Sequence, residues 1–392
     1  MCRFVEFKNR RIQAALAKHN LTALIASLPE NIDYLSGYKS IGHEILNRTQ
    51  LFSLYLAGEN CAALVIPTAE VPTAVERLPK MEKVCFGDFT FATPATGMET
   101  ILAIINDREE DSFQALVRTL TAGGIKNGRV GVDEGRITPQ LWQGLAEALP
   151  GVEFVPAADI FYEIRAIKHQ AEIDNLEQAA EIAEQALLSL LPTITVGTTE
   201  LEMERVFMEE VASRGGKPYF NVMTVDERSA FVDTISTNQP VQDGSVLRFD
   251  FGCIYKGYCS DLARTAVFGG GDGKVHRYYE AILAGEDQAI KQLCPGISAE
   301  EIFRIAVNET KRAGIAHYDR HHCGHGIGLE IYDHPLIAPG VKTPLEVGMV
   351  LCIETPYYEL GWGGIQVEDT IVITEQGARF LSKSSRDLIR LG

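Results

Sequence analysis

The segment 349–374, MVLCIETPYYELGWGGIQVEDTIVIT, constrains the fold most, because it places two glutamates in apolar, strand-like runs. Glu354 ends the run VLCIE, Glu368 follows the run IQV, and the two lie symmetrically about the glycine-rich stretch 361–364. This pattern predicts two strands joined by a turn. A lone carboxylate is costly to bury among apolar side chains. Exposed strand positions explain one such glutamate easily but both poorly, so the pair indicates a shared site.

A second strand–turn–strand segment, SVLRFDFGCIYKGYCSDLARTAVFG at 245–269, carries Asp250 and Asp261 in its two arms. The arms are rich in Val, Phe and Tyr, which is typical of a β-hairpin. With Tyr255 and Lys256 as a two-residue turn, Asp250 faces Asp261, and side chains opposed in this way lie about 5 Å apart on one face. Two carboxylates so close repel unless a cation lies between them. On this hairpin alone, two unrelated acids at exposed strand ends are an equal alternative, and a bulge would shift the register by one.

Between these hairpins lies HHCGHGIGLEIYDHP, 321–335, which contains four histidines and Cys323. A zinc knuckle is disfavoured, because no C-x-x-C pair exists and adjacent ligands give poor tetrahedral geometry. The three glycines at 324, 326 and 328 instead predict a backbone packed close to its neighbours, with His325 reaching the same cavity as the four acids. Four carboxylates and one imidazole suit manganese, cobalt, zinc or iron in a two-ion site.

The chain has 392 residues, more than one hydrophobic core usually supports, so two domains are expected. Over the first ~160 residues, strand-like runs alternate with helical ones, which predicts a mainly parallel α/β sheet. The strands are expected at 21–26, 61–67, 83–89 and 128–134, with helical patterns over about 5–19 and over 99–120. No G-x-G-x-x-G phosphate loop follows any of these strands.

The second half has a different pattern, with antiparallel strands from 245 onward and fewer, longer helices. Helices are expected over 170–191, from Thr198 as an N-cap, over 276–293 and over 298–313. The pattern is that of an α+β domain. We therefore predict domains at 1–163 and 164–392.

Composition excludes several classes of function. Fifty-three acidic and 36 basic residues give a formal net charge of −17, which argues against binding nucleic acid or anionic membranes. No apolar stretch approaches ~18 uninterrupted residues, and the N-terminus lacks the apolar run of a secretory signal. The eight cysteines form no C-x-x-C pair. They are expected to be free thiols in a reducing compartment, so we predict a cytoplasmic protein.

The ordered motifs FDFG, SDLART, GHGIGL, IETP and VEDT resemble the pita-bread-fold metallopeptidases, which include prolidase, aminopeptidase P, methionine aminopeptidase and creatinase. The resemblance covers roughly 165–392. The N-terminal α/β domain and the linker IRAIKHQAEI are similar to those of the prolidase, aminopeptidase P and creatinase branch. Methionine aminopeptidases lack such a domain. The resemblance implies a creatinase-like first domain, a catalytic domain with a curved, mainly antiparallel sheet, and a homodimer.

The resemblance also implies roles for the five ligand positions. Asp250 and Glu368 would bridge two divalent metal ions, Asp261 would hold one of them, and His325 and Glu354 would hold the other. Two cations would make hydroxide available near neutral pH. Glu354 would then act as the general base that takes the proton and passes it to the leaving nitrogen.

The departures from the family fall around the metal ligands. Asp233 stands where prolidase and aminopeptidase P place a histidine seventeen residues before the first metal aspartate, and Tyr332 stands in place of a second histidine. Gln366 replaces a common arginine, whereas His321 keeps a family histidine as a candidate catalytic residue. Asp233, Tyr332, Gln366 and His334 are thus the expected substrate-binding residues. His334, His322 or Arg264 are candidates to fill the vacated roles.

Three functions compete on these grounds. The first is a metal-dependent Xaa-Pro dipeptidase or aminopeptidase acting on short peptides. The second is a hydrolase or lyase of a small non-peptide substrate, such as a betaine, amidine or cyclic amide, at the same metal site. The third is a non-catalytic binding paralogue, which the retention of five costly polar ligands disfavours.

Overall fold

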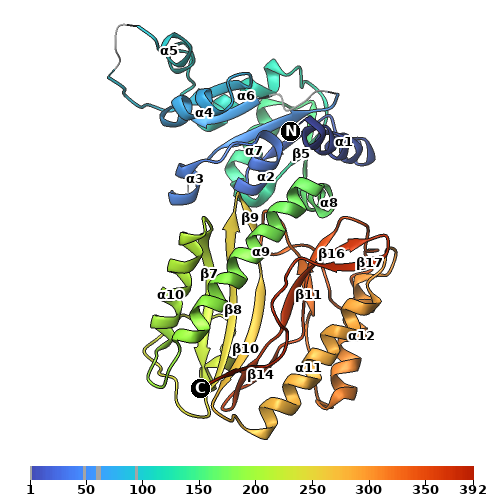
Figure 1. The fold of residues 1–392 in the computed structure, drawn as a ribbon. Coiled ribbons are helices and arrows are strands. Elements are labelled where there is room, and N and C mark those ends of the chain that lie inside the picture. The colour runs from blue at the N-terminus through green and yellow to red at the C-terminus, as the bar shows by residue number, and fades with distance from the viewer. Residues whose placement is uncertain (1, 47–49, 59–62, 93–95) are drawn as a thin grey trace. The chain divides into compact units, whose positions relative to one another are not determined.

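The computed structural model describes residues 2–46, 50–58, 63–92 and 96–392 of the chain. The chain divides into two compact units, Met1–Ile164 and Arg165–Gly392, each with its own sheet. Figure 1 shows the N-terminal unit in blue to green and the C-terminal unit in green to red.

The N-terminal unit contains a six-stranded sheet in the order β4-β3-β2-β1-β5-β6. Its strands are β1 (Ala23–Ala26), β2 (Phe52–Leu56), β3 (Ala63–Pro67), β4 (Glu82–Phe86), β5 (Gly128–Val132) and β6 (Val152–Pro156). The pairs β3/β4, β1/β5 and β5/β6 are parallel, whereas β2 pairs antiparallel with both β1 and β3. The expected mainly parallel sheet is confirmed, although two of its strands, β2 and β6, were not predicted. Positions 61 and 62 of the strand expected at 61–67 lie outside the described residues.

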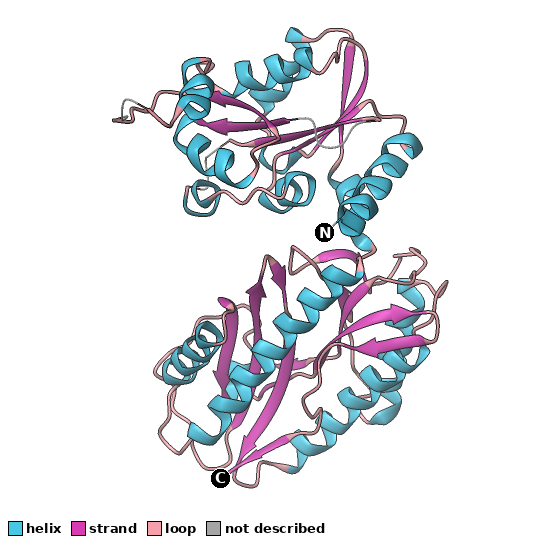
Figure 2. Ribbon diagram, turned by 45° about the horizontal axis from the view of Figure 1, so that its top comes forward, coloured by secondary structure: helices cyan, strands magenta, loops and turns pink. Residues whose placement is uncertain are grey.

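Helices pack around this sheet (Figure 2). They are α1 (Cys2–Lys18), α2 (Pro29–Ser36), α3 (Ile41–Ile45), α4 (Val71–Arg77), α5 (Glu99–Asn106), α6 (Ser112–Ala122), α7 (Pro139–Ala148) and α8 (Ala158–Ala166), with short 3₁₀ turns at Thr68–Glu70 and Glu134–Arg136. The single helical pattern expected over 99–120 is wrong, because the chain breaks there into α5 and α6. Glu109 leaves the helix to form an isolated bridge with Phe86, and the Asp111 side chain caps the start of α6.

The C-terminal unit is built on a sheet in the order β12-β11-β13-β16-β10-β8-β7, with β17, β18 and β9 pairing beside it. Its strands are β7 (Lys217–Val225), β8 (Val246–Tyr255), β9 (Tyr258–Cys259), β10 (Leu262–Phe268), β11 (Gly324–Gly326), β12 (Asp333–Leu336), β13 (Val350–Glu354), β16 (Glu368–Thr374), β17 (Gly377–Phe380) and β18 (Ile389–Leu391). All pairs except β10/β18 are antiparallel. A small hairpin, β14 (Tyr357–Glu359) with β15 (Gly363–Ile365), connects β13 to β16. The expected α+β domain with a curved, mainly antiparallel sheet is confirmed.

Four long helices belong to this unit: α9 (Gln170–Leu190), α10 (Glu200–Ser213), α11 (Gly273–Gln292) and α12 (Ala299–Ala313), with 3₁₀ turns at Leu191–Thr193 and Asp226–Ala230. Figure 2 shows α9 running along the strands. The expected cap at Thr198 is wrong by one residue. Thr199 caps α10, and it forms a capping box with Glu202 in which each residue satisfies the other's backbone N–H.

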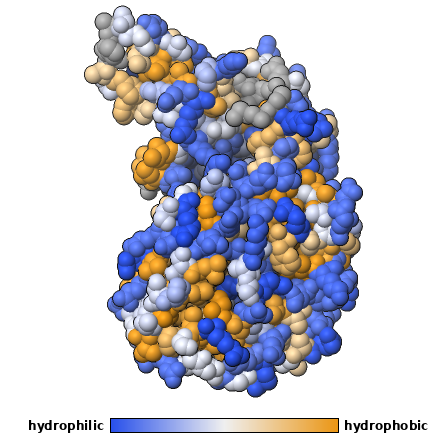
Figure 3. Space-filling model, viewed as in Figure 1, coloured by the Kyte–Doolittle hydropathy of each residue, from blue (hydrophilic) through white to orange (hydrophobic). Residues whose placement is uncertain are grey.

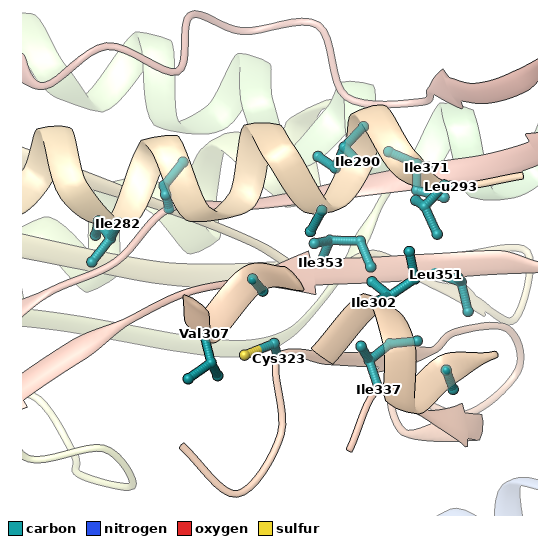
Figure 4. Packing of buried hydrophobic residues seen from close by; sticks show 14 of the residues in the cluster. Ile282, Ile290, Leu293, Ile302, Val307, Cys323, Ile337, Leu351, Ile353 and Ile371 are labelled. Atoms are coloured by element: carbon teal, nitrogen blue, oxygen red, sulfur yellow. The ribbon is translucent and has the colours of Figure 1, made fainter. Parts of the chain in front are cut away.

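Apolar side chains on one face of the large sheet form its core with these helices. Phe249 and Phe251 of β8 pack with α9 and α10, whereas Leu351 and Ile353 of β13 pack with α11 and α12 (Figure 4). Because side chains alternate along a strand, the residues between them point to the opposite face. That opposite face therefore carries Asp250 and the residues aligned with it.

The surface, the helices and the cysteines are the features that would mark a membrane or disulfide-bonded protein. In the view of Figure 3, hydrophobic residues form separate patches among hydrophilic ones. No described helix contains an apolar stretch of membrane-spanning length. Six described cysteines are free thiols, at 85, 253, 259, 294, 323 and 352. The Cys2 side chain and Cys61 lie outside the described residues.

Candidate active site

Three of the expected metal ligands lie in one row across the large sheet. Asp250 of β8 pairs with Ala263 of β10, Ala263 pairs with Glu368 of β16, and Glu368 pairs with Glu354 of β13. Directly opposed residues point to the same face of a sheet. The sheet register therefore gathers three carboxylates on one face, and the symmetry expected for Glu354 and Glu368 is confirmed.

Asp261 reaches the same face by a register that differs from the expected one. The two-residue turn is Lys256-Gly257, at φ 51° and 94°, so Tyr255 pairs with Tyr258 and Asp250 opposes Ala263. The expected opposition of Asp250 and Asp261 is wrong by two positions, because this tight turn needs two residues at positive φ and Gly257 meets that need readily. A shift of two keeps the same face, so Asp261 lies diagonal to Asp250.

His325 joins the acids from β11. Its Nε2 lies 3.4 Å from Asp261 Oδ2 and 3.9 Å from Glu368 Oε1, and its Nδ1 lies 3.0 Å from the Gly326 carbonyl oxygen. The expected close backbone packing is confirmed, because a Cβ at Gly324 would lie 2.1 Å from the Cys352 carbonyl oxygen. At Gly326 it would lie 2.3 Å from the His334 carbonyl oxygen. Glycine at these positions lets β11 approach its neighbours and places His325 among the carboxylates.

The electrostatics of this group favour a cation. Burial, together with the charges of Asp261 and Glu354, raises the pKa of Asp250 to about 7. Burial raises the pKa of Asp261, and burial with four other carboxylates, Asp261 first among them, raises that of Glu368 well above its ordinary range. Asp261 Oδ1 and Glu368 Oε1 are buried without a hydrogen-bond partner in the structure. Unpaired oxygens and mutual repulsion are what divalent cations would relieve, so the donor set fits the metal ions expected from the sequence.

Cys352 is a neighbour that the sequence did not indicate as a ligand. Its sulfur, Asp261, His325 and Glu368 offer ligand atoms that all lie within 4.8 Å of one another. Burial, then the charges of Asp261 and Glu368, raises the pKa of the Cys352 thiol well above its ordinary range. The Cys352 sulfur lies 3.6 Å from the Asp261 carbonyl oxygen and 3.6 Å from Thr370 Oγ1, so it already has two hydrogen-bond partners.

Glu354 differs from the other acids, because its pKa is lowered. Burial alone would raise it, but the His322 hydrogen bond and the charge of Arg320 outweigh burial. His322 Nδ1 lies 3.1 Å from Glu354 Oε1, and Arg320 Nη2 lies 3.9 Å from Glu354 Oε2. An ionised carboxylate can accept a proton, so Glu354 is the acid in this group whose charge state suits a base.

The structure places His322, rather than His321, against Glu354. His321 is exposed and lines the cavity, with its ring edge-on to that of His322 at a centroid distance of 4.3 Å. Both residues precede β11 in a loop, where strand alternation cannot say which ring points inward. Our prediction that His321 is catalytic therefore stays a prediction, and His322 has the closer geometry.

The guanidinium of Arg248 contacts Asp250, the first of the expected metal ligands. Arg248 lies two residues before Asp250 on the same face, and its Nη1 donates at 3.0 Å to Asp250 Oδ2 and to Gln366 Oε1. Its Nε and Nη2 donate to carbonyl oxygens in the segment 229–232. Gln366 in turn donates from Nε2 to Glu368 Oε2 at 3.2 Å. Arg248 thus supplies a charge next to Gln366, the position where the resembled family carries an arginine.

The remaining expected substrate residues lie at different places. The Tyr332 ring stacks on the His325 ring at 3.8 Å between centroids and 22° between planes. Asp233 is exposed and lines the cavity, but His334 is exposed on β12 and is not among the residues that line it. Arg264 lies on the helical face, paired with Asp369 at 2.8 Å, so neither it nor His334 fills a vacated role in the cavity.

These side chains surround a cavity of about 580 Å³ within the C-terminal unit. Its polar wall includes Asp250, Asp261, Glu354, Glu368 and Gln366. The rest of its lining is largely apolar or aromatic and includes Tyr219, Phe220, Val222, Val232, Ile331 and Tyr332. The cavity can therefore hold a small ligand with one apolar side beside a cluster of carboxylates.

This fold and site define a metallopeptidase. Residues 174–375 match Metallopeptidase family M24, and residues 9–167 match the Creatinase/Prolidase N-terminal domain. The chain belongs to family M24, and it is a metal-dependent hydrolase of the prolidase and aminopeptidase P branch. The match favours this class over the non-peptide hydrolase or lyase and over the non-catalytic paralogue.

Individual relatives agree with this assignment. The chain is 31% identical to an Xaa-Pro dipeptidase of Pyrococcus furiosus over 293 residues, which cover 74% of this chain and 82% of the relative. It is similar to the solved prolidase of Pyrococcus horikoshii, with 28% identity, a TM-score of 0.80, and coverage of 97% and 99% of the two chains. An Xaa-Pro dipeptidase from Bacillus anthracis has a similar fold, with 23% identity, a TM-score of 0.83, and coverage of 99% and 100%.

The raised pKa values predict how the metal-free protein responds to pH. A carboxyl with a raised folded-state pKa stabilises the fold below its unfolded-state pKa, near 4, and that stability is lost as the pH rises through the folded value. For Asp250 this window ends at about pH 7. Thermal unfolding of chelator-treated protein should show a melting temperature that falls from pH 5 to pH 8, because each such group lowers the free energy of unfolding by at most about 1.4 kcal/mol per pH unit. Asp250→Asn should flatten the slope, and an unchanged slope would contradict this account.

Proposed function

We propose that this protein is a metal-dependent Xaa-Pro dipeptidase. The observation that carries the proposal is the convergence of Asp250, Asp261, Glu354 and Glu368 on one cavity, with His325 Nε2 3.4 Å from Asp261 Oδ2, in a chain similar to Xaa-Pro dipeptidases. The apolar side chains that line the cavity suit a pyrrolidine ring, and the polar ones suit the scissile amide.

We further propose roles for the residues of the polar wall. The five ligands would hold two divalent ions (manganese, cobalt, zinc or iron), which when bound supply a hydroxide near neutral pH. Glu354 takes the proton and returns it to the leaving nitrogen, and His322 holds Glu354 in its ionised form. Arg248 fixes Asp250 and Gln366, while Tyr332 covers one face of His325. His321 and Asp233 face the substrate from the rim of the cavity.

The setting and assembly also belong to this proposal. Free cysteines, five of the six described ones being buried, support a reducing compartment, so we propose that the enzyme is cytoplasmic. We propose a homodimer of two-domain subunits, with the domains at 1–163 and 164–392, from the resemblance to the prolidase branch. The acidic net charge of −17 supports small substrates rather than nucleic acid as partners.

A substrate screen tests this function. Metal-reconstituted protein should cleave Gly-Pro and Ala-Pro dipeptides and leave betaines, amidines and lactams unchanged. We expect kcat/KM to be about 10- to 100-fold below that of a relative with histidines at positions 233 and 332, because Asp233 and Tyr332 replace hydrogen-bond donors to the tetrahedral intermediate. Turnover of a non-peptide with no peptide cleavage would overturn the proposal. Rates equal to the relative's would show only that these two replacements are neutral.

A further inference from the structure

The loop between β11 and β12 brings two of its residues, Ile331 and Tyr332, into the lining of the cavity. The Tyr332 ring stacks on the His325 ring, but Tyr332 is 48% exposed, so its neighbours cover only part of the side chain. The ladder between β11 and β12 is also irregular, because its register shifts between His325 and Gly326. The position of the Tyr332 ring therefore depends on what fixes the loop on either side of it.

The residues that flank this pair are both acidic, and one guanidinium nitrogen binds both of them. Arg165 Nη2 donates to Glu330 Oε1 at 2.6 Å and to Asp333 Oδ1 at 3.1 Å. Lys168 Nζ lies 3.5 Å from Asp333 Oδ2. Arg165 is in the last turn of α8 and begins the C-terminal unit, to which all these residues belong. A segment distant in the sequence thus holds both ends of the Ile331-Tyr332 pair.

These charged groups are buried, so each of them needs a partner of opposite charge. The side chains of Arg165, Lys168 and Asp333 are 3%, 2% and 0% exposed. Burial alone would raise the pKa of Asp333, but the charges of Arg165 and Lys168 outweigh burial and lower that pKa. The packing here is close, because a Cβ at Gly328 would lie 2.8 Å from Asp333 Oδ2. The ion pairs therefore hold the loop in one arrangement.

We propose that Arg165 is a positioning residue of the active site, because its bonds to the two acids hold Tyr332 against His325. Arg165 is not among the residues that line the cavity, so it acts through the loop rather than on the substrate. Consecutive residues of an extended chain point to opposite sides, which lets Asp333 face Arg165 while Tyr332 faces the cavity. The consequence for peptide cleavage rests on the proposed Xaa-Pro dipeptidase function.

A spectroscopic test reports on the stacking directly, without activity or metal. In metal-free protein carrying isotope-labelled histidine, the ring current of Tyr332 should shift the ring signal of His325 upfield, and Tyr332→Leu should identify that signal by removing the shift. Arg165→Gln should move the signal toward its position in Tyr332→Leu. The control Arg379→Gln removes the same charge from an exposed side chain on β17 and should leave the signal unchanged.

A second variant covers the case in which Arg165→Gln does not fold, since removing one member of a buried ion pair is costly. Glu330 is 22% exposed, and Glu330→Ala leaves the pair of Arg165 with Asp333 intact. It should move the His325 signal part of the way. A folded Arg165→Gln with the wild-type signal overturns the assignment, and so does Glu330→Ala with that signal where Arg165→Gln does not fold.

Steady-state kinetics with Ala-Pro connects the position of the ring to function. Arg165→Gln should lower kcat/KM by about 10-fold, mainly through KM, because Tyr332 lines the cavity. In a Tyr332→Leu background the same change should have almost no further effect, because residues that act through one contact are not additive. Equal losses in both backgrounds would overturn the proposal. If no Xaa-Pro peptide is cleaved, the proposed function fails, and the His325 signal still decides the role of Arg165.

Discussion

Glu354→Gln is expected to lower kcat by about 10²- to 10⁴-fold, the range usual for loss of a general base. Glu354 is the one acid of the group whose pKa is lowered, because its His322 hydrogen bond and the Arg320 charge outweigh its burial. Glutamine keeps the shape of the side chain and can still accept a hydrogen bond, but it cannot take a proton. Steady-state hydrolysis of Ala-Pro across pH 6–9 measures the effect.

The matched control is Glu301→Gln in the first turn of α12, where the half-buried carboxylate pairs only with Arg304 among the described ion pairs. It makes the same chemical change far from the cavity and should keep wild-type activity. Metal content must be measured for both variants, because Glu354 is also an expected ligand. Full activity of Glu354→Gln with normal metal content would contradict the base assignment. A low rate that extra metal restores would limit Glu354 to a ligand role.

The sequence predicted the acids of the site because strand alternation and turn symmetry are local properties. Glu354 and Glu368 flank one connection symmetrically, and the structure pairs them directly. Asp250 and Asp261 flank a turn whose position depends on which residues adopt positive φ, and Gly257 moved that turn by one residue. The register changed by two and the face did not, so the candidate site survived an incorrect pairing.

The side-chain contacts around these four acids could not be predicted from strand alternation or turn symmetry. Arg248 lies two residues before Asp250, so alternation places it on the same face, but its donation to Gln366 requires β8 and β16 to be close in the folded sheet. Arg320 and His322 lie in a loop without a periodic pattern. Their contacts with Glu354 depend on the path of that loop, which no local rule fixes.

The N-terminal sheet shows a related limit. The missed strand β2, FSLYL, is buried at every position, so it lacks the alternation that marks a strand with one exposed face. The missed strand β6 is only partly buried beside β5. Both strands depend on their neighbours more than on their own sequence.

Removal of metal is expected to abolish peptide cleavage and to destabilise the protein at pH 8. Without cations, Asp250, Asp261, Glu354 and Glu368 face one another on a buried surface, and two of their oxygens have no hydrogen-bond partner. Elemental analysis of protein prepared with manganese or cobalt should find up to two ions per chain. Chelation should remove both the ions and the activity, and adding metal should restore the two together.

The same buried carboxylates predict that Glu368→Gln stabilises the metal-free protein and destabilises the metal-loaded protein. In the metal-free protein at pH 8, Glu368→Gln should raise the free energy of unfolding by about 1–3 kcal/mol, because it removes a carboxylate that burial and its neighbours oppose. In the metal-loaded protein the same change should lower stability, because it removes a ligand and the stabilisation that metal binding gives. The control Glu301→Gln, which removes only the pair with Arg304, should change both states alike and by a smaller amount. A Glu368→Gln variant destabilised equally with and without metal would show that Glu368 serves packing rather than a cation, since only a cation makes its charge favourable on that face of the sheet.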